Sequence, residues 1–166
     1  MERIIIVDGY NLMYCVKKNE TEEAETLEDA RYRMIEQLKN YAVFQKQDVI
    51  LVFDGAGKKE DLEEYKHLQV VFTKKEETAD TYIEKIAAAL VRKDYGVTVV
   101  TSDYEEQKSI FGSGAIRLSS REFLLDLQDS KDKEKKYFRA KSGQRNLLDQ
   151  SIDARIVGIL KTMRRG

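Results

Sequence analysis

Carboxylates are the side chains of this sequence whose number and positions suggest chemistry. The chain has 30 Asp and Glu, but a single His, His67, and a single Cys, Cys15. One of each is too few for an intrachain disulfide, a Cys/His zinc site or a paired-histidine mechanism. Asp80 stands near the start of an amphipathic stretch. Three other aspartates each follow a short apolar run by no more than two residues: Asp8, Asp54 and Asp103.

The apolar runs predict the strands of a mostly parallel sheet. They are continuously apolar and rich in Val and Ile, which is typical of strands covered on both faces, and amphipathic stretches separate them. We expect helices over 21–45 and 78–93, the second ending before Gly96, and a third helix opened by a capping box of Ser119 and Glu122. The five predicted strands are 4–7, 49–53, 70–73, 97–101 and 115–118.

Parallel strands bring their carboxyl ends to one edge of a sheet, where ligands bind at the topological switch point. Asp8 and Asp103 should therefore converge there, with Asp80 leaning toward them from the first turn of its helix. Converging like charges oppose folding unless a cation neutralises them. Oxygen ligands favour Mg²⁺ or Mn²⁺, so the predicted reaction is metal-assisted hydrolysis of a phosphodiester.

Four further residues near these acids have two interpretations each. Asn11 could orient a ligand carboxylate or a phosphate, or could cap a helix or lie in a loop. Asp54 could be an additional ligand, although Asp54 followed by a glycine is also typical of a turn. Glu77 and Glu106 could be outer ligands or surface residues.

The net charge of −1 conceals two segments of opposite charge. Residues 1–130 carry 18 Lys and Arg against 26 Asp and Glu, a net charge of −8, whereas residues 131–166 carry 11 against 4, a net charge of +7. We predict a catalytic domain over 1–130 and a basic segment with a terminal helix over 131–166. Tyr137 and Phe138 interrupt the basic residues and suit base stacking, although such a segment can also be a solvated face. The candidate RNA contacts are Lys133, Lys135, Lys136, Arg139, Lys141, Arg145, Arg164 and Arg165.

The sequence predicts neither a membrane segment nor an organic cofactor. No apolar run approaches the roughly 18 residues that span a bilayer, and the apolar stretch at the start is too short for a signal peptide. A cytoplasmic location is the simplest expectation. The phosphate-binding Gly-rich loop with Lys and Ser or Thr is missing from the sequence, and Gly112 and Gly114 lack the third glycine of a dinucleotide fingerprint.

Four short blocks follow one another between about residue 3 and residue 128: Asp8-Gly9-Tyr10-Asn11, Val52-Phe53-Asp54-Gly55, Phe72-Thr73 with Glu77-Thr78-Ala79-Asp80, and Thr101-Ser102-Asp103-Tyr104-Glu105-Glu106-Gln107. Together these blocks resemble the YacP-like branch of the NYN domains, a PIN-like group of metal-dependent ribonucleases. The resemblance implies a PIN-like three-layer α/β/α sandwich in which Asp8, Asp80 and Asp103 carry Mg²⁺ or Mn²⁺ beside Asn11, and in which RNA is cut endonucleolytically. It also implies mRNA as the substrate and the ribosome as a partner.

Two other functions remain open from the sequence. A nuclease-like fold could serve only as an RNA or ribosome adaptor, which would bind without needing Mn²⁺ and would form no product. A phosphotransfer enzyme could use Asp8 as the phosphorylated group. Hydrolases of that kind carry a second Asp two residues after the nucleophile, and that position is Tyr10 here. This feature disfavours phosphotransfer.

Overall fold

The structure is a computed structural model that describes residues 1–19, 25–55, 61–102 and 112–165. The chain divides into two compact units, Met1–Ser130 and Lys131–Gly166. The sheet lies in the first unit, and the second consists of the greater part of one helix. No helix in the described ranges combines the length and the apolar character needed to cross a membrane.

A six-stranded mixed sheet in the order β3-β4-β2-β1-β5-β6 carries the site. All five predicted strands are confirmed, and they run parallel. The additional strand, β3, runs antiparallel to β4 at the edge, and its acidic, mostly exposed side chains explain why no apolar run marks it. The strands are β1 (Arg3–Asp8), β2 (Asp48–Phe53), β3 (Asp61–Tyr65), β4 (Leu68–Phe72), β5 (Gly96–Val100) and β6 (Ile116–Leu118).

The register brings the ends of the central strands level with one another. Asp8 of β1 pairs with Val52 of β2, and Val7 pairs with Val100 of β5. We call the side of the sheet at which β1, β2, β4 and β5 end the carboxyl edge. The strand order runs in one direction from β1 to β2 and β4 and in the other to β5 and β6, so the switch point lies between β1 and β5.

Four helices are described: α1 (Gly9–Asn19), α2 (Leu27–Gln45), α3 (Ala79–Arg92) and α5 (Ser120–Arg165). The sequence did not predict α1, which begins directly after β1. The helix predicted over 21–45 corresponds to α2, whose N-cap is Thr26; residues 20–24 lie outside the described ranges. The helix predicted over 78–93 corresponds to α3, which ends before Gly96 as expected, but glycine is not the residue that terminates it. Asp94 is the left-handed residue after α3, with a φ of 67°, and Gly96 opens β5.

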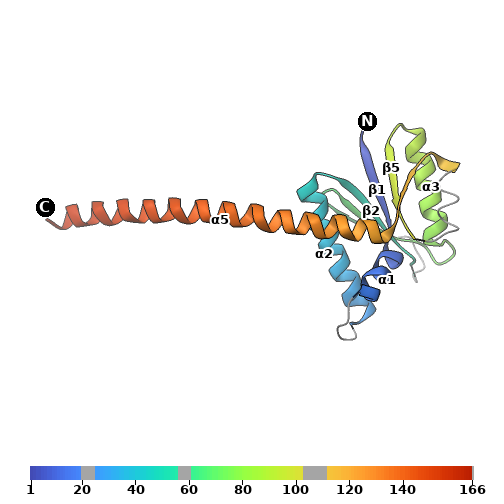
Figure 1. Cartoon of the computed structure of the whole chain (residues 1–166), viewed down its shortest axis with the longest axis horizontal. Coiled ribbons are helices and arrows are strands. Elements are labelled where there is room, and N and C mark those ends of the chain that lie inside the picture. The colour runs from blue at the N-terminus through green and yellow to red at the C-terminus, as the bar shows by residue number, and fades with distance from the viewer. Residues whose placement is uncertain (20–24, 56–60, 103–111, 166) are drawn as a thin grey trace. The chain divides into compact units, whose positions relative to one another are not determined.

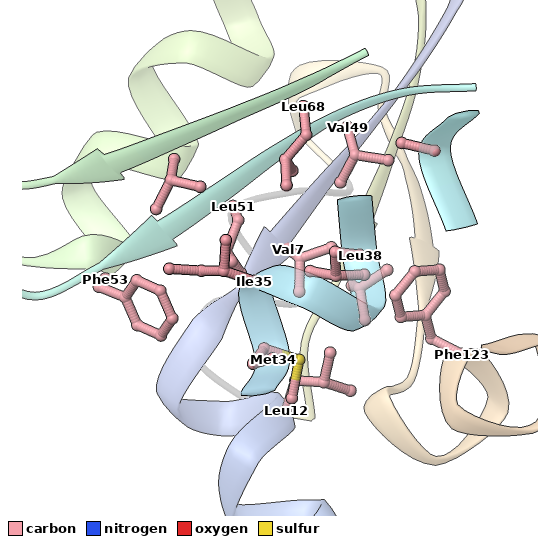
Figure 2. Close-up of a cluster of buried hydrophobic side chains, with 13 residues drawn as sticks. Val7, Leu12, Met34, Ile35, Leu38, Val49, Leu51, Phe53, Leu68 and Phe123 are labelled. Carbon is pink, nitrogen blue, oxygen red and sulfur yellow. The ribbon is translucent and has the colours of Figure 1, made fainter. Parts of the chain in front are cut away.

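Two apolar clusters cover the two faces of the sheet and make three layers. In Figure 1, α3 lies on one side of the sheet, and α1 and α2 lie on the other. Figure 2 shows the cluster under α1 and α2, where Leu12, Met34 and Leu38 meet side chains of the sheet such as Phe53. Phe123, from the first turns of α5, is buried in the same cluster. The layered α/β fold expected from the sequence is thereby confirmed.

The capping box at the start of α5 is confirmed. The backbone N–H of Glu122 donates to Ser119 Oγ at 3.2 Å, and the backbone N–H of Ser119 donates to Glu122 Oε2 at 2.9 Å. These hydrogen bonds with Ser119 lower the pKa of Glu122 from its ordinary value. A lowered folded-state pKa stabilises the protein above the unfolded pKa, and this contribution disappears as the pH falls through the folded pKa.

We therefore expect Ser119→Ala to lower the free energy of unfolding by about 1 kcal/mol at neutral pH. The difference from the wild type should shrink as the pH falls through the lowered pKa of Glu122, because the Ser119 side chain, which the substitution removes, stabilises only the ionised form of Glu122 by its hydrogen bond. Thermal unfolding of the wild type and of Ser119→Ala, at pH 7 and at a pH below the pKa of Glu122, measures this difference in stability. An equal difference at both pH values would assign the whole effect to the hydrogen bond from the Glu122 backbone N–H to the Ser119 hydroxyl.

Candidate functional site

Three predicted site residues lie at the carboxyl edge. Asp8 is the last residue of β1 and is only 8% exposed. Asp54 follows β2 directly, and Asp80 is an exposed residue in the first turn of α3. Asp103 and Glu106 fall outside the described residues. The structure thus describes two of the three predicted metal ligands, and both belong to the same edge of the sheet.

The start of α1 fixes the carboxylate of Asp8. Asp8 Oδ1 accepts a hydrogen bond of 3.2 Å from the backbone N–H of Asn11, in the first turn of the helix. A helix N-terminus favours a negative charge, so the ionised carboxylate is stabilised there. A Cβ atom at Gly9 would collide with the ring of Phe53. Glycine therefore allows α1 to begin directly after Asp8.

Asp54 connects the end of β2 to α3. Its Oδ1 atom accepts a hydrogen bond from the backbone N–H of Ala79, the first residue of α3. The following residue, Gly55, donates its backbone N–H to the hydroxyl of buried Thr73 at 3.1 Å, and a Cβ atom there would collide with the Thr73 carbonyl oxygen. Asp54 thus holds the helix that carries Asp80 at the carboxyl edge.

Glu77 is engaged in an ion pair. Its Oε1 atom lies 2.8 Å from Lys85 Nζ, and its side chain is only 10% exposed, against 60% for Lys85. The ammonium group of Lys85 balances the charge of Glu77, so a metal ion would compete with that lysine for the carboxylate. Glu77 stays a candidate outer ligand, but binding a metal ion would require it to give up the ion pair with Lys85.

Asn11 links three elements across the switch point. Its Oδ1 atom accepts hydrogen bonds from the backbone N–H of Ser102, at 2.9 Å, and from the hydroxyl of Ser120, at 2.6 Å. The backbone N–H of Ser120 in turn donates to Ser102 Oγ at 3.2 Å. Asn11 belongs to α1, Ser102 follows β5 and immediately precedes Asp103, and the fully buried Ser120 begins α5. We call these three residues the Asn11 network.

The Asn11 network restricts what Asn11 can do chemically. A carbonyl oxygen has two lone pairs, and protein donors use both of them here. The NH₂ group of Asn11 has no hydrogen-bond partner among the described residues, and it can donate to a phosphate or a carboxylate but cannot bind a cation. Sequence reasoning missed Ser102 and Ser120 as members of the site, because they are 91 and 109 residues away from Asn11 along the chain.

His67 lies away from the site. Its Nδ1 atom is 2.8 Å from Asp48 Oδ1, and Asp48 is the first residue of β2, at the end of the sheet opposite to the carboxyl edge. This pair gives His67 a structural contact between the turn before β4 and the start of β2.

The donor atoms at the carboxyl edge fit a hard cation in type. Asp8, Asp54 and Asp80 supply carboxylate oxygens, which Mg²⁺ and Mn²⁺ prefer. Within the described ranges, no group of three or more His, Cys, Asp or Glu side chains is close enough to hold an ion. The third predicted ligand, Asp103, is outside those ranges.

Comparison with known proteins identifies the family. The sequence model described as the YacP-like NYN domain matches residues 5–165. The chain belongs to the YacP-like NYN domain family. YacP of Bacillus subtilis (strain 168) is 39% identical to this NYN domain protein over 127 residues, which are 75% of each chain.

Solved structures of the same relative confirm the family and the fold. The crystal structure of Rae1 (YacP) from Bacillus subtilis superimposes with a TM-score of 0.73 at 32% identity, covering 98% of this chain and 95% of that one. The structure of a mutant of Rae1 gives a TM-score of 0.71 at 35% identity, covering 85% and 84%. Membership of the NYN family indicates a nuclease-type, RNA-related function, and NYN nucleases generally use divalent metals.

Proposed function

We propose that this YacP-like NYN domain protein is a divalent-metal-dependent endoribonuclease that cuts mRNA on or near the translating ribosome, in the cytoplasm. The observation that carries the proposal is the placement of two carboxylates at the carboxyl edge. Asp8 is held there by the first turn of α1, and Asp80 is held there by the bond between Asp54 and α3. Both acids stand in the blocks that resemble the family.

Each residue of the proposed site has a distinct role. Asp8, Asp80 and Asp103 would hold Mg²⁺ or Mn²⁺. The bound ion would supply a water of lowered pKa and would neutralise negative charge on the phosphate. The NH₂ group of Asn11 would orient the phosphate, while its Oδ1 atom holds Ser102, the residue next to Asp103.

The basic segment of the second unit would hold the RNA or the ribosome. An acidic site repels RNA, so a separate cationic surface is needed to attract the backbone. Tyr137 and Phe138 are 50% and 55% exposed, and Lys141 Nζ lies 5.2 Å from the centroid of the Tyr137 ring. The side chains of Arg145, Arg164 and Arg165 lie outside the part that the structure describes. The described basic side chains are all exposed: Lys133, Lys135, Lys136, Arg139 and Lys141.

Neutralising Lys133, Lys135 and Lys136 together should flatten the salt dependence of RNA or ribosome association. Three lost phosphate contacts reduce the slope of log affinity against log salt concentration by about 2 for single-stranded RNA. A matched triple change of Lys46, Lys66 and Lys93 to glutamine removes the same charge from the turns that precede β2, β4 and β5, at the end of the sheet away from the carboxyl edge. Equal slopes for the two triple variants would assign the basic segment to solubility.

The proposed function is tested by incubating the protein with translating ribosomes and with free RNA, in Mg²⁺ or Mn²⁺, and by mapping the cut ends. The proposal predicts new internal ends that depend on the metal, with more cleavage on the ribosome-bound message. Binding of RNA or ribosomes without product, at every metal concentration, would instead establish the adaptor function.

A further inference from the structure

Arg31 is a half-buried cation beside the carboxyl edge that pairs with no carboxylate among the described residues. Its Nη1 atom donates to the hydroxyl of Tyr10 at 3.4 Å, and its Cζ atom lies 5.9 Å from the centroid of the Phe72 ring. Arg33, on the same helix, forms an ion pair of 2.8 Å with Glu25. Two arginines of α2 thus have different surroundings, and one of them faces aromatic rings instead of an acid.

The aromatic rings place Arg31 next to the proposed site. Tyr10 lies two residues after Asp8, and its ring packs edge-on against Phe53 at 5.1 Å between centroids. Phe53 in turn stacks on Phe72 at 5.4 Å. Phe53 and Phe72 are the last residues of β2 and β4, which end at the carboxyl edge. Arg31 therefore lies at this edge, on the side of α1 and α2.

The chemistry of a guanidinium in this position suits a phosphate. Arginine carries five N–H donors in a planar fork that matches the oxygens of a phosphate, and aromatic rings hold the fork without using its donors. Among the described residues, the Tyr10 hydroxyl is the one hydrogen-bond acceptor of the Arg31 guanidinium, so most of the N–H groups are available to a ligand. A cation at the border of an acidic site also offsets the repulsion between the carboxylates and RNA.

We propose that Arg31, oriented by Tyr10 and Phe72, binds a backbone phosphate of single-stranded RNA next to the nucleotide that is cut. The proposal rests on the proposed function and names a binding residue for its substrate. Tyr10 is a positioning residue, because it acts through the guanidinium.

The test compares Arg31→Gln with Arg33→Gln, which removes the same charge from the same helix. Both are placed in an Asp80→Asn background so that the RNA stays intact, and the affinity for a labelled single-stranded RNA is measured at several salt concentrations. Arg31→Gln should weaken binding about 10-fold, as expected for hydrogen bonds to a charged group. It should also reduce the salt slope by about 0.7, the value for one phosphate contact. Arg33→Gln should change neither quantity.

Two further variants separate a phosphate contact from a structural role. Arg31→Lys keeps the charge and should retain the salt slope while binding more weakly. Tyr10→Phe keeps the ring and the cation and should weaken binding without changing the slope. If Arg31→Gln lowers the melting temperature, the affinities and salt slopes of Arg31→Lys and Tyr10→Phe still test the proposal. Equal affinities and slopes for the Arg31 and Arg33 variants, or a loss of slope in Tyr10→Phe, would overturn the proposal.

The nuclease proposal and the Arg31 proposal fail separately. The wild-type protein could cut no RNA in any metal and still bind RNA through Arg31. That result would overturn the nuclease proposal and support the phosphate site. Metal-dependent cleavage together with RNA binding that is independent of Arg31 would support the nuclease proposal and overturn the Arg31 proposal.

Discussion

Replacing Asp80 with asparagine is expected to slow RNA cleavage at least ~100-fold, which is about 2.7 kcal/mol of activation free energy. Asparagine has the size of aspartate, but it lacks the charge with which Asp80 would hold a divalent ion. The melting temperature should stay unchanged or rise. The N-terminus of α3 stabilises the charge of Asp80 by about 0.3–1 kcal/mol, and Asp80→Asn loses this stabilisation. The variant also relieves the repulsion between Asp80 and neighbouring acids, which offsets the loss.

A single-turnover cleavage assay and a thermal melt measure these two effects. Glu84→Gln is the matched control, because Glu84 is an exposed acid on the same helix, one turn further from the carboxyl edge. It should cleave at the wild-type rate. Cleavage near the wild-type rate by Asp80→Asn would remove Asp80 from the metal site.

Asn11→Ala is expected to lower the free energy of unfolding by about 1–3 kcal/mol, because the buried hydroxyl of Ser120 loses its acceptor. Cleavage should also slow, since Ser102, which precedes Asp103, loses the bond that holds its backbone. Urea unfolding and the cleavage assay measure the two effects separately.

Asn11→Asp is the informative partner of this variant. An aspartate keeps an oxygen that accepts from Ser102 and Ser120, so the loss of stability should be smaller than in Asn11→Ala. It lacks the NH₂ group and adds a charge beside Asp8, so cleavage should still slow. The double variant Asn11→Ala/Ser120→Ala should lose less free energy of unfolding than the sum of the losses in the two single variants, because both remove the same hydrogen bond. Additive effects would contradict the Asn11 network.

The sequence predicts most of the sheet because burial on both faces leaves a continuous apolar run, as in β1 and β2. The capping box of α5 was equally predictable, since its two side chains are three residues apart. Strand β3 was missed because an exposed acidic edge strand carries no such run. Helix α1 was missed because a glycine after a strand usually indicates a turn.

The position of three aspartates at the carboxyl edge was predictable from the sequence, but the contacts around them were not. Asp8, Asp54 and Asp80 each stand at an element boundary, which local pattern reveals. The bonds from Asn11 to Ser120 and from Arg31 to Tyr10 depend on tertiary packing, and the residues of each pair are 109 and 21 positions apart. Spacing along the chain gives no signal for either contact.

The most direct test of the metal site is the metal preference of Asp80→Cys in RNA cleavage. A thiolate binds Mg²⁺ poorly and binds softer ions such as Cd²⁺ well. We expect Asp80→Cys to be nearly inactive in Mg²⁺ alone and to gain at least ~10-fold when Cd²⁺ is added. The wild type, which already carries Cys15, should show no such gain. Cleavage by Asp80→Cys at the wild-type rate in Mg²⁺ alone would contradict a metal ion bound by Asp80.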